Sequence, residues 1–455
     1  MMNDPREALN NVRTESSPSD LKITAIRFAD IWGAPMQCIL MKVYTNQGLV
    51  GYGEVRDFAD KRYALMLKSR LIGQNPCNVE KIFKEIKQFG GQSRQGGGVS
   101  GIEVALWDLA GKAWDVPVWQ LLGGKYRDKI RLYCDTDIDG KPDGKKMGEA
   151  LKARRDKGFT MLKMDLGIDL LMDVPGALNA PLGLLDELRR EGNEPDHRYG
   201  DFNRRATFDR SRELQSIEHF RTGITITDIG WKWLDNYVRE ARDVVGYDIP
   251  IAVDHVGHIG LTECIKLGHM LEKYNIAWME DAIPWQLSDQ WAILRRSVAV
   301  PVATGEDIYL KENFKPLLEA GGVSLIHPDI LTSGGILENK KIGDMAQDYG
   351  VGMVIHMAET PVACLAAVHS AAATQNVLAL EFHSNDIPWW QDIVEYPYKP
   401  IVDHGFIKVP DLPGLGIEGI NDDVIKEHID NDKIPGLWEP TDEWNDTYAH
   451  DRLWS

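Results

Sequence analysis

The chain has 455 residues, 43% of them hydrophobic and 26% charged, so it can bury the cores of two domains. Its formal net charge of −18 disfavours nucleic acid and anionic membranes as partners. The five cysteines form no CxxC pair, which predicts free thiols in a reducing compartment. A polar N-terminus and the lack of an apolar run of roughly 20 residues lead us to expect a cytoplasmic protein that does not span a membrane.

The first 125 residues predict a polar arm followed by a small α+β domain. Residues 1–20 are rich in Ser, Asn and Asp, which is typical of a flexible arm. From Leu21 the chain alternates like strands over 22–28, 38–45 and 48–55. Helical periodicity follows over 59–72, 79–88 and 101–114, and the glycine-rich stretch 90–98 interrupts it. We expect this domain to cover residues 21–125.

Beyond residue 125, strands and helices alternate. Eight apolar runs read as strands, over 130–135, 161–165, 251–254, 277–280, 302–306, 324–329, 353–356 and 378–381. Helical segments between them favour a closed, TIM-like α/β barrel over residues 126–395. An open doubly wound sheet is the alternative, but no glycine-rich phosphate turn follows the first strand.

The crossover between the second and third strands is too long for one helix. Asp165 and Asp254 are 89 residues apart, whereas the later repeats take 23 to 27 residues. Helix 231–245 accounts for the ordinary crossover, and residues 167–221 form an insertion that contains several arginines. It leaves from a carboxyl strand end, where barrel active sites are built. The insertion is a lid, an oligomer contact or a solvated surface excursion.

Polar residues end six successive strands at nearly equal spacing, with steps of 26, 26, 23, 27 and 25 residues. In a barrel all six would lie on the same rim. The first three are carboxylates, which repel one another unless a cation neutralises them, and oxygen-only ligation suits Mg²⁺. The six residues are Asp254, Glu280, Glu306, Asp329, His356 and Glu381.

This arrangement resembles the enolase superfamily, and within it the mandelate racemase subgroup, over about residues 20 to 395. The stretches Ser100-Gly-Ile-Glu-Val-Ala-Leu-Trp-Asp-Leu-Ala-Gly-Lys-Ala and Pro117-Val-Trp-Gln-Leu-Leu-Gly-Gly support the resemblance. It implies a modified (β/α)₇β barrel sealed by an N-terminal capping domain. It also implies that residues 396–455 return to pack on the capping domain.

The resemblance also implies roles for the strand-end residues. Asp254, Glu280 and Glu306 would hold one Mg²⁺, which binds a substrate carboxylate and stabilises an enediolate. His356 would remove the α-proton, and Asp329 would hydrogen-bond one ring nitrogen and fix its tautomer. Glu381 would contact the enediolate or the carboxylate, or support the site from behind.

The second strand departs from the family pattern. Many members of the subgroup carry Lys-x-Lys there, whereas this chain has Lys163-Met-Asp165. Lys163 could contact the substrate carboxylate or orient the base. Asp165 could titrate, or pair with Lys163 or an arginine of the insertion, and we favour pairing. Because racemisation needs an acid/base group on each face of the α-carbon, the missing lysine favours elimination by His356 alone.

Other candidates would contact substrate. Arg56 could meet a distal hydroxyl or carboxylate, and Trp32 lies in a predicted loop of the capping domain. His255 and His258 follow the metal-binding Asp254 by one and four residues. Some sugar-acid dehydratases of the subgroup have a histidine two residues after that Asp, which acts as a general acid. His255 or His258 could protonate the leaving hydroxyl, or each could be a loop residue without a catalytic role.

These features predict a Mg²⁺-dependent hydro-lyase that converts a sugar acid into a 2-keto-3-deoxy acid. An aldonate is favoured over an aldarate because Arg56 is the one strong anion receptor that we find outside the metal centre. A racemase, epimerase or cycloisomerase on the same scaffold is the alternative. A rival of another class is a non-catalytic relic that binds sugar acids. We expect a homo-oligomer of undetermined order.

Overall fold

The computed structural model describes residues 16–138, 140–180, 225–254, 259–429 and 437–448. The chain divides into two compact units. Unit 1 comprises Met1–Leu132, Gly305–Lys315 and Ile326–Ser455, and unit 2 comprises Tyr133–Thr304 and Pro316–Leu325. The domain boundaries given above remain a prediction. In the described residues, no helix combines the length and the apolar character needed to cross a bilayer.

The fold class predicted from the sequence is confirmed: eight parallel strands close into a barrel, and an extra strand, β15 (Phe406–Lys408), pairs antiparallel with β4. The sheet order is β13-β12-β11-β10-β9-β8-β5-β4-β15, and a pairing of β13 with β4 closes it. The barrel strands are β4 (Lys129–Cys134), β5 (Leu162–Asp165), β8 (Ile251–Asp254), β9 (Met279–Glu280), β10 (Val302–Thr304), β11 (Leu325–Ile326), β12 (Gly352–Ile355) and β13 (Val377–Phe382).

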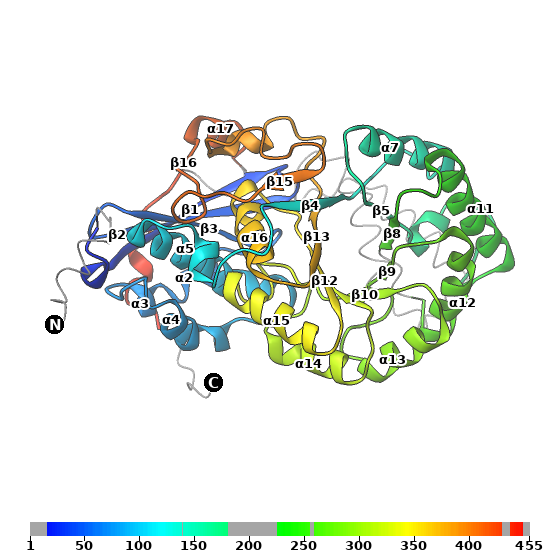
Figure 1. Cartoon of the computed structure of the whole chain (residues 1–455), viewed down its shortest axis with the longest axis horizontal. Coiled ribbons are helices and arrows are strands. Elements are labelled where there is room, and N and C mark those ends of the chain that lie inside the picture. The colour runs from blue at the N-terminus through cyan, green and yellow to red at the C-terminus, as the bar shows by residue number, and fades with distance from the viewer. Residues whose placement is uncertain (1–15, 139, 181–224, 255–258, 430–436, 449–455) are drawn as a thin grey trace, which may run out of the picture. The chain divides into compact units, whose positions relative to one another are not determined.

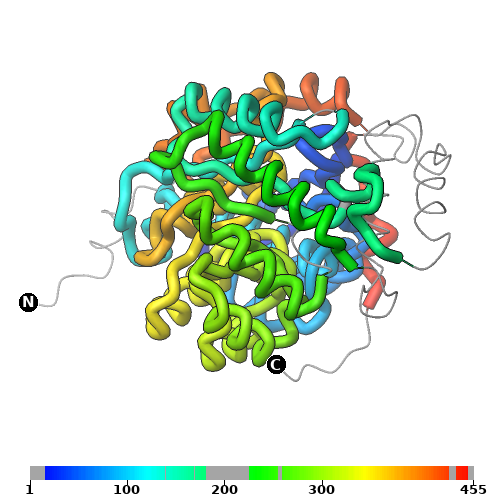
Figure 2. The backbone as a smooth tube through the Cα atoms, turned by 90° about the vertical axis from the view of Figure 1, so that its right-hand side faces the viewer, coloured from blue at the N-terminus to red at the C-terminus, as the bar shows by residue number. Residues whose placement is uncertain are grey.

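A helix follows each of the first seven barrel strands, which gives the (β/α)₇β pattern. The helices are α7 (Gly144–Asp156), α11 (Asp228–Val245), α12 (Leu261–Leu271), α13 (Ser288–Ser297), α14 (Lys311–Glu319), α15 (Ile336–Asp348) and α16 (Pro361–Ala373). In unit 2, the helices α7, α11, α12 and α13 lie side by side, facing the viewer in Figure 2. The 3₁₀ turn η6 (Trp390–Ile393) follows β13.

Three strands are clearly shorter than the sequence suggested: β9 covers only Met279–Glu280 of the predicted 277–280, and two others end early for local reasons. We expected a strand to reach Glu306, but β10 ends at Thr304 because Gly305 has a φ of 154°, a region that favours glycine. We also expected a strand over 324–329, but β11 covers only Leu325–Ile326. Pro328 follows closely, and proline has no amide hydrogen for a sheet ladder.

Unit 1 contains a three-stranded antiparallel sheet that packs against a long helix. The strands are β1 (Ile23–Trp32), β2 (Gln37–Thr45) and β3 (Val50–Val55), and α5 (Gly97–Trp114) packs on β3 (Figure 1). The shorter helices α2 (Arg62–Leu65), α3 (Lys68–Leu71) and α4 (Val79–Ile86) complete this part of the core.

The glycine-rich stretch does not end where we expected, because α5 begins at Gly97 and not at residue 101. Backbone proximity explains why glycines stand there. A Cβ on Gly97 would lie 2.6 Å from the amide nitrogen of Arg56, and a Cβ on Gly98 would lie 2.3 Å from the carbonyl carbon of Tyr63. Since only glycine allows this approach, composition alone misleads about the helix start.

Two buried glutamates of the N-terminal elements of unit 1 bind the starts of α15 and α16. Glu103 of α5 accepts hydrogen bonds from the amides of Ile336 (2.6 Å) and Leu337 (3.0 Å). Glu54 of β3 accepts from the Thr360 hydroxyl (2.5 Å) and from two amides near the start of α16. Helix starts carry unpaired amide donors, so these carboxyl groups act as caps supplied from elsewhere in the chain.

The C-terminal residues of unit 1 contact its first strands and helices. β14 (Val394–Glu395) pairs with β16 (Gly419–Ile420), and α17 (Asp422–Glu427) follows. The amide of Trp438 donates to the carbonyl of Phe28 in β1 (3.2 Å). Lys68 Nζ of α3 donates to the carbonyl of Thr441 (2.7 Å).

The predicted insertion lies mostly outside the described residues. Its described base includes the 3₁₀ turn η4 (Ile168–Leu171) and a two-stranded antiparallel ribbon of β6 (Leu178–Asn179) and β7 (Thr225–Ile226). Residues 181–224 are not described, so the prediction of a lid or an oligomer contact falls outside the described structure.

Candidate active site

In unit 1, His356 and Asp329 form a buried hydrogen-bonded pair at the ends of neighbouring barrel strands. His356 follows β12, and its Nδ1 lies 2.8 Å from Asp329 Oδ2. The other oxygen of Asp329 accepts from the amides of Leu331 (2.6 Å) and Thr332 (2.9 Å), which fixes the carboxylate. If the Nδ1 hydrogen is donated to Asp329, then Nε2 is the nitrogen left for proton transfer.

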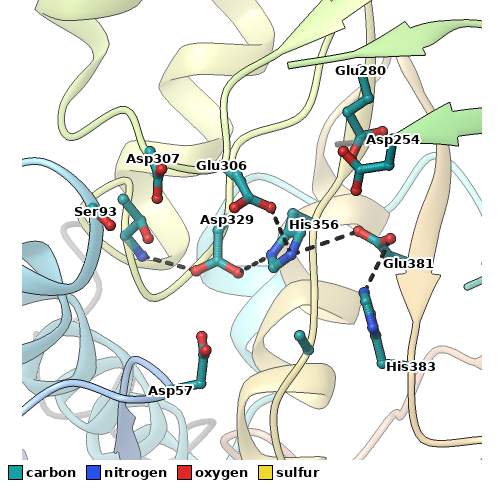
Figure 3. Close-up of polar contacts among 12 residues, drawn as sticks. Asp57, Ser93, Asp254, Glu280, Glu306, Asp307, Asp329, His356, Glu381 and His383 are labelled. Atoms are coloured by element: carbon teal, nitrogen blue, oxygen red, sulfur yellow. Dashed lines mark hydrogen bonds and ion pairs between the residues drawn. The ribbon is translucent and has the colours of Figure 1, made fainter. Parts of the chain in front are cut away.

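The Nε2 side of His356 faces two further carboxylates (Figure 3). Glu306 Oε2 lies 2.9 Å away and Glu381 Oε2 lies 3.9 Å away. Burial acts to lower the pKa of His356, but these carboxylates and Asp329 outweigh it and raise that pKa well above its ordinary value. Although burial opposes it, the positive charge of His356 holds the pKa of Glu306 well below the usual range.

Arg56 is a buried partner of the same acids. Its side chain is 0% exposed, with Nε 2.7 Å from Asp57 Oδ1 and Nη1 2.5 Å from Asp329 Oδ2. Nη1 also lies 3.2 Å from His356 Nδ1 and 3.5 Å from Glu359 Oε1. The guanidinium that we assigned to substrate is therefore occupied by protein groups, and its contact with substrate remains a prediction.

Several residues of this cluster were not among the sequence candidates. Burial first, and then the Asp329 charge, raise the pKa of Glu359 well above its ordinary value. Asp57 is held by both Arg56 and Arg94, and Arg94 Nη2 lies 3.1 Å from Asp57 Oδ2. Glu359 lies three residues after His356, so its place in the loop after β12 was the available signal.

In unit 2, a second buried cluster joins Lys163 to two of the predicted metal ligands. Lys163 of β5 is 1% exposed, and its Nζ lies 2.6 Å from Asp254 Oδ2 and 3.0 Å from Glu280 Oε1. The indole of Trp278 donates to Glu280 Oε2 (2.6 Å). Two buried carboxylates thus converge on the ammonium group of Lys163.

Asp165 ends β5 and is half-buried, in strand register with Asp254. We favoured an ion pair between Asp165 and Lys163 or an insertion arginine. The ammonium of Lys163 lies against Asp254 and Glu280. The role of Asp165 therefore remains a prediction.

The third predicted ligand, Glu306, belongs to unit 1, so the complete Mg²⁺ triad remains a prediction. Within the described part of unit 1, two groups have ligand atoms close enough to hold a metal ion. They are His356 with Glu381 and His383, and Asp329 with His356 and Glu359. The fold therefore offers acidic and imidazole donors for a divalent cation.

The remaining substrate candidates differ in how well they can be placed. Trp32, at the end of β1, is half-buried and packs edge-on against Phe58 with ring centroids 6.0 Å apart. His255 and His258 lie outside the described residues.

Comparisons with known proteins agree with this architecture. Residues 22–123 match the mandelate racemase / muconate lactonizing enzyme N-terminal domain, and residues 146–424 match the enolase C-terminal domain-like family. A D-xylonate dehydratase of Haloferax volcanii is 31% identical over 399 residues, which cover 86% of this chain and 85% of that protein.

Two solved structures are similar over most of their length. A mandelate racemase/muconate lactonizing enzyme-like protein from Rubrobacter xylanophilus has a TM-score of 0.74 at 27% identity, covering 90% of this chain and 98% of its own. A dehydratase-like protein from Salmonella enterica has a TM-score of 0.72 at 29% identity, with the same coverage of 90% and 98%. The chain therefore belongs to the enolase superfamily, in its mandelate racemase subgroup.

Proposed function

We propose that this enzyme removes water from an aldonic sugar acid and releases a 2-keto-3-deoxy acid. The observation that carries the proposal is the His356–Asp329 pair, in which Asp329 fixes one ring nitrogen and leaves the other for proton abstraction. Similarity to a D-xylonate dehydratase over 86% of the chain supports the lyase class and a sugar-acid substrate.

The proposed metal is Mg²⁺, held by Asp254, Glu280 and Glu306. Asp254 and Glu280 are buried carboxylates that already converge on the Lys163 ammonium, so the donor chemistry fits a hard divalent cation. Bound there, Mg²⁺ would neutralise the substrate carboxylate and the negative charge that develops when the C2 proton leaves.

The residues of the chain supply the proton transfers. Asp329 orients His356. In the metal-free protein the surrounding carboxylates favour the protonated imidazole, and Glu306 pairs with its Nε2. A cation held by Glu306 would weaken that pair, so that a neutral Nε2 could take the proton from C2. Lys163 supplies a fixed positive charge beside Asp254 and Glu280. Asp165 stands where a racemase would carry its opposite-face lysine, so a base on one face of the α-carbon favours elimination.

The contacts of Arg56 favour an aldonate over an aldarate. An aldarate has a second carboxylate that needs its own cation. Arg56 was our candidate for that task, but its guanidinium is buried and paired with Asp57 and Asp329. A neutral polyol end therefore suits the site better.

A panel of aldonates, including D-xylonate, and aldarates should be incubated with the enzyme in Mg²⁺ and after treatment with a chelator. We expect Mg²⁺-dependent formation of a 2-keto acid, abolished by His356→Asn and Asp254→Asn. His404→Asn is a matched control, because that side chain is 86% exposed. Isomerised acid without a keto product would refute the dehydratase in favour of a racemase or epimerase, and unchanged turnover in His356→Asn would refute the site.

A further inference from the structure

His383 lies on the same face of its strand as Glu381. It directly follows β13, and side chains two residues apart on a strand point to the same side. Phe382, between them, packs edge-on against Trp390 with ring centroids 5.2 Å apart. The alternation therefore places His383 beside the catalytic cluster, one step beyond the strand end.

Glu381 stands between two imidazoles (Figure 3). Its Oε1 lies 3.2 Å from Nε2 of His383, and its Oε2 lies 3.9 Å from Nε2 of His356. The two histidine rings are 5.9 Å apart between centroids and tilted by 55°. His383 is 15% exposed, compared with 6% for His356 and 0% for Glu381, so it is the most accessible of the three.

Elimination of a hydroxyl group needs an acid as well as a base. Hydroxide is a poor leaving group, and a positioned acid that protonates it contributes typically ~10²–10⁴-fold to the rate. His356 is occupied with the C2 proton in the proposed reaction. The imidazole of His383 lies 5.9 Å from that of His356 between ring centroids, and both contact the carboxylate of Glu381. An acid at this spacing from the base suits a leaving group on the carbon next to C2.

We propose that His383 is the general acid that protonates the C3 hydroxyl as it leaves, an inference that rests on the proposed dehydratase function. The C2–H bond breaks and its proton goes to His356. The C3–O bond breaks, the hydroxyl takes the proton of His383, and water departs. The enol then gains a proton at C3 from water and gives its C2 hydroxyl proton to water. A proton passed from His356 through Glu381 restores His383. The sequence balances as loss of one water.

A purely structural role for His383, namely holding Glu381 in place, makes a different prediction. If His383 only positions Glu381, its removal should slow C2 proton abstraction together with water loss. If His383 is the acid, its removal should spare C2 proton abstraction. It should also spare elimination from a 3-deoxy-3-fluoro analogue of the substrate, because fluoride leaves without protonation.

The test compares His383→Asn, His383→Gln and His356→Asn with the exposed control His404→Asn in the Mg²⁺-loaded enzyme. We expect both His383 variants to lose about 10²–10⁴-fold in kcat for dehydration. They should keep C2 deuterium exchange and fluoride release within a few-fold of the wild type, whereas His356→Asn should lose all three. Thermal unfolding shows which of the two His383 variants is folded. The rates of the folded variant test the assignment.

Two results would overturn the assignment while leaving the dehydratase function intact. One is dehydration by the folded His383 variant within a few-fold of the wild type. The other is loss of exchange and fluoride release as severe as in His356→Asn. Failure of the wild-type enzyme to form a keto acid from any sugar acid would instead overturn the proposed function, and the assignment with it.

Discussion

Replacement of Arg56 by methionine would remove the guanidinium at the centre of the buried acid cluster of unit 1. The arginine side chain is 0% exposed, and its partners Asp57 and Asp329 are 1% and 0% exposed. Methionine fills much of the same volume with a flexible apolar chain, so the main change is the loss of the positive charge and its hydrogen bonds. The two carboxylates would stay buried with less compensation.

The expected loss is large because the acids cannot reach water. Breaking a buried ion pair by removing one partner typically lowers the free energy of unfolding by about 3–5 kcal/mol. Two neighbours moderate the loss, because Arg94 still contacts Asp57 at 3.1 Å and His356 still contacts Asp329 at 2.8 Å. We therefore expect a loss of about 3 kcal/mol, at the lower end of that range.

Urea unfolding measures this change without screening charges, provided that fluorescence and circular dichroism give the same transition. Arg62→Met is the matched control: its guanidinium pairs with Asp60 at 2.5 Å, but the side chain is 72% exposed. We expect no measurable shift of its midpoint. A loss below about 1 kcal/mol in Arg56→Met, the range of exposed pairs, would refute the reasoning, and so would equal losses in both variants.

Three further predictions concern other buried groups. Burial raises the pKa of Glu103 to about 8, so the folded state holds a proton that the unfolded state loses above about pH 4.5. The contribution of Glu103 to the free energy of unfolding should therefore be lost as pH rises through about 8. Glu103→Gln should flatten the profile of urea midpoint against pH. An unchanged slope in that variant would contradict the prediction. Gly101→Ala should lower the melting temperature, although alanine favours helices by about 1 kcal/mol, because its Cβ would lie 2.2 Å from the Glu54 carbonyl oxygen; a rise would show that the backbones can separate. Lys163→Met should destabilise the metal-free protein by about 3–5 kcal/mol, and added Mg²⁺ should raise its melting temperature more than that of the wild type. An equal rise in melting temperature for Lys163→Met and the wild type would argue against a site that Lys163 and Mg²⁺ share.

The sequence predicted the barrel well because its signal is periodic and local. Strand 251–254 ends at Asp254 in the structure as predicted, since an apolar run followed by an acid marks both the strand and its carboxyl end. The predicted start of α5 was wrong, because close approach to the backbone of Arg56 and Tyr63, and not local conformation, requires the glycines at 97 and 98.

The surroundings of Arg56 could not be predicted from local pattern. Its partners Asp329 and Glu359 lie more than half the chain away in sequence, and no periodicity links them to the end of β3. The position of His383 was within reach of alternation, since it lies two residues after Glu381. What the sequence did not reveal was that this histidine contacts the same carboxylate, Glu381, that faces Nε2 of His356.

The glutamate caps on α15 and α16 have a consequence for domain exchange. Those helices follow the segments that carry Asp329 and His356, yet the carboxyl groups that bind their first turns come from Glu103 and Glu54. A chimera that grafts residues 21–125 of a relative onto this barrel would keep Asp329 and His356. It would lose the caps unless the donor also supplied glutamates at both positions. A stable chimera therefore needs its N-terminal segment and the segment that contains α15 and α16 to match at these glutamates.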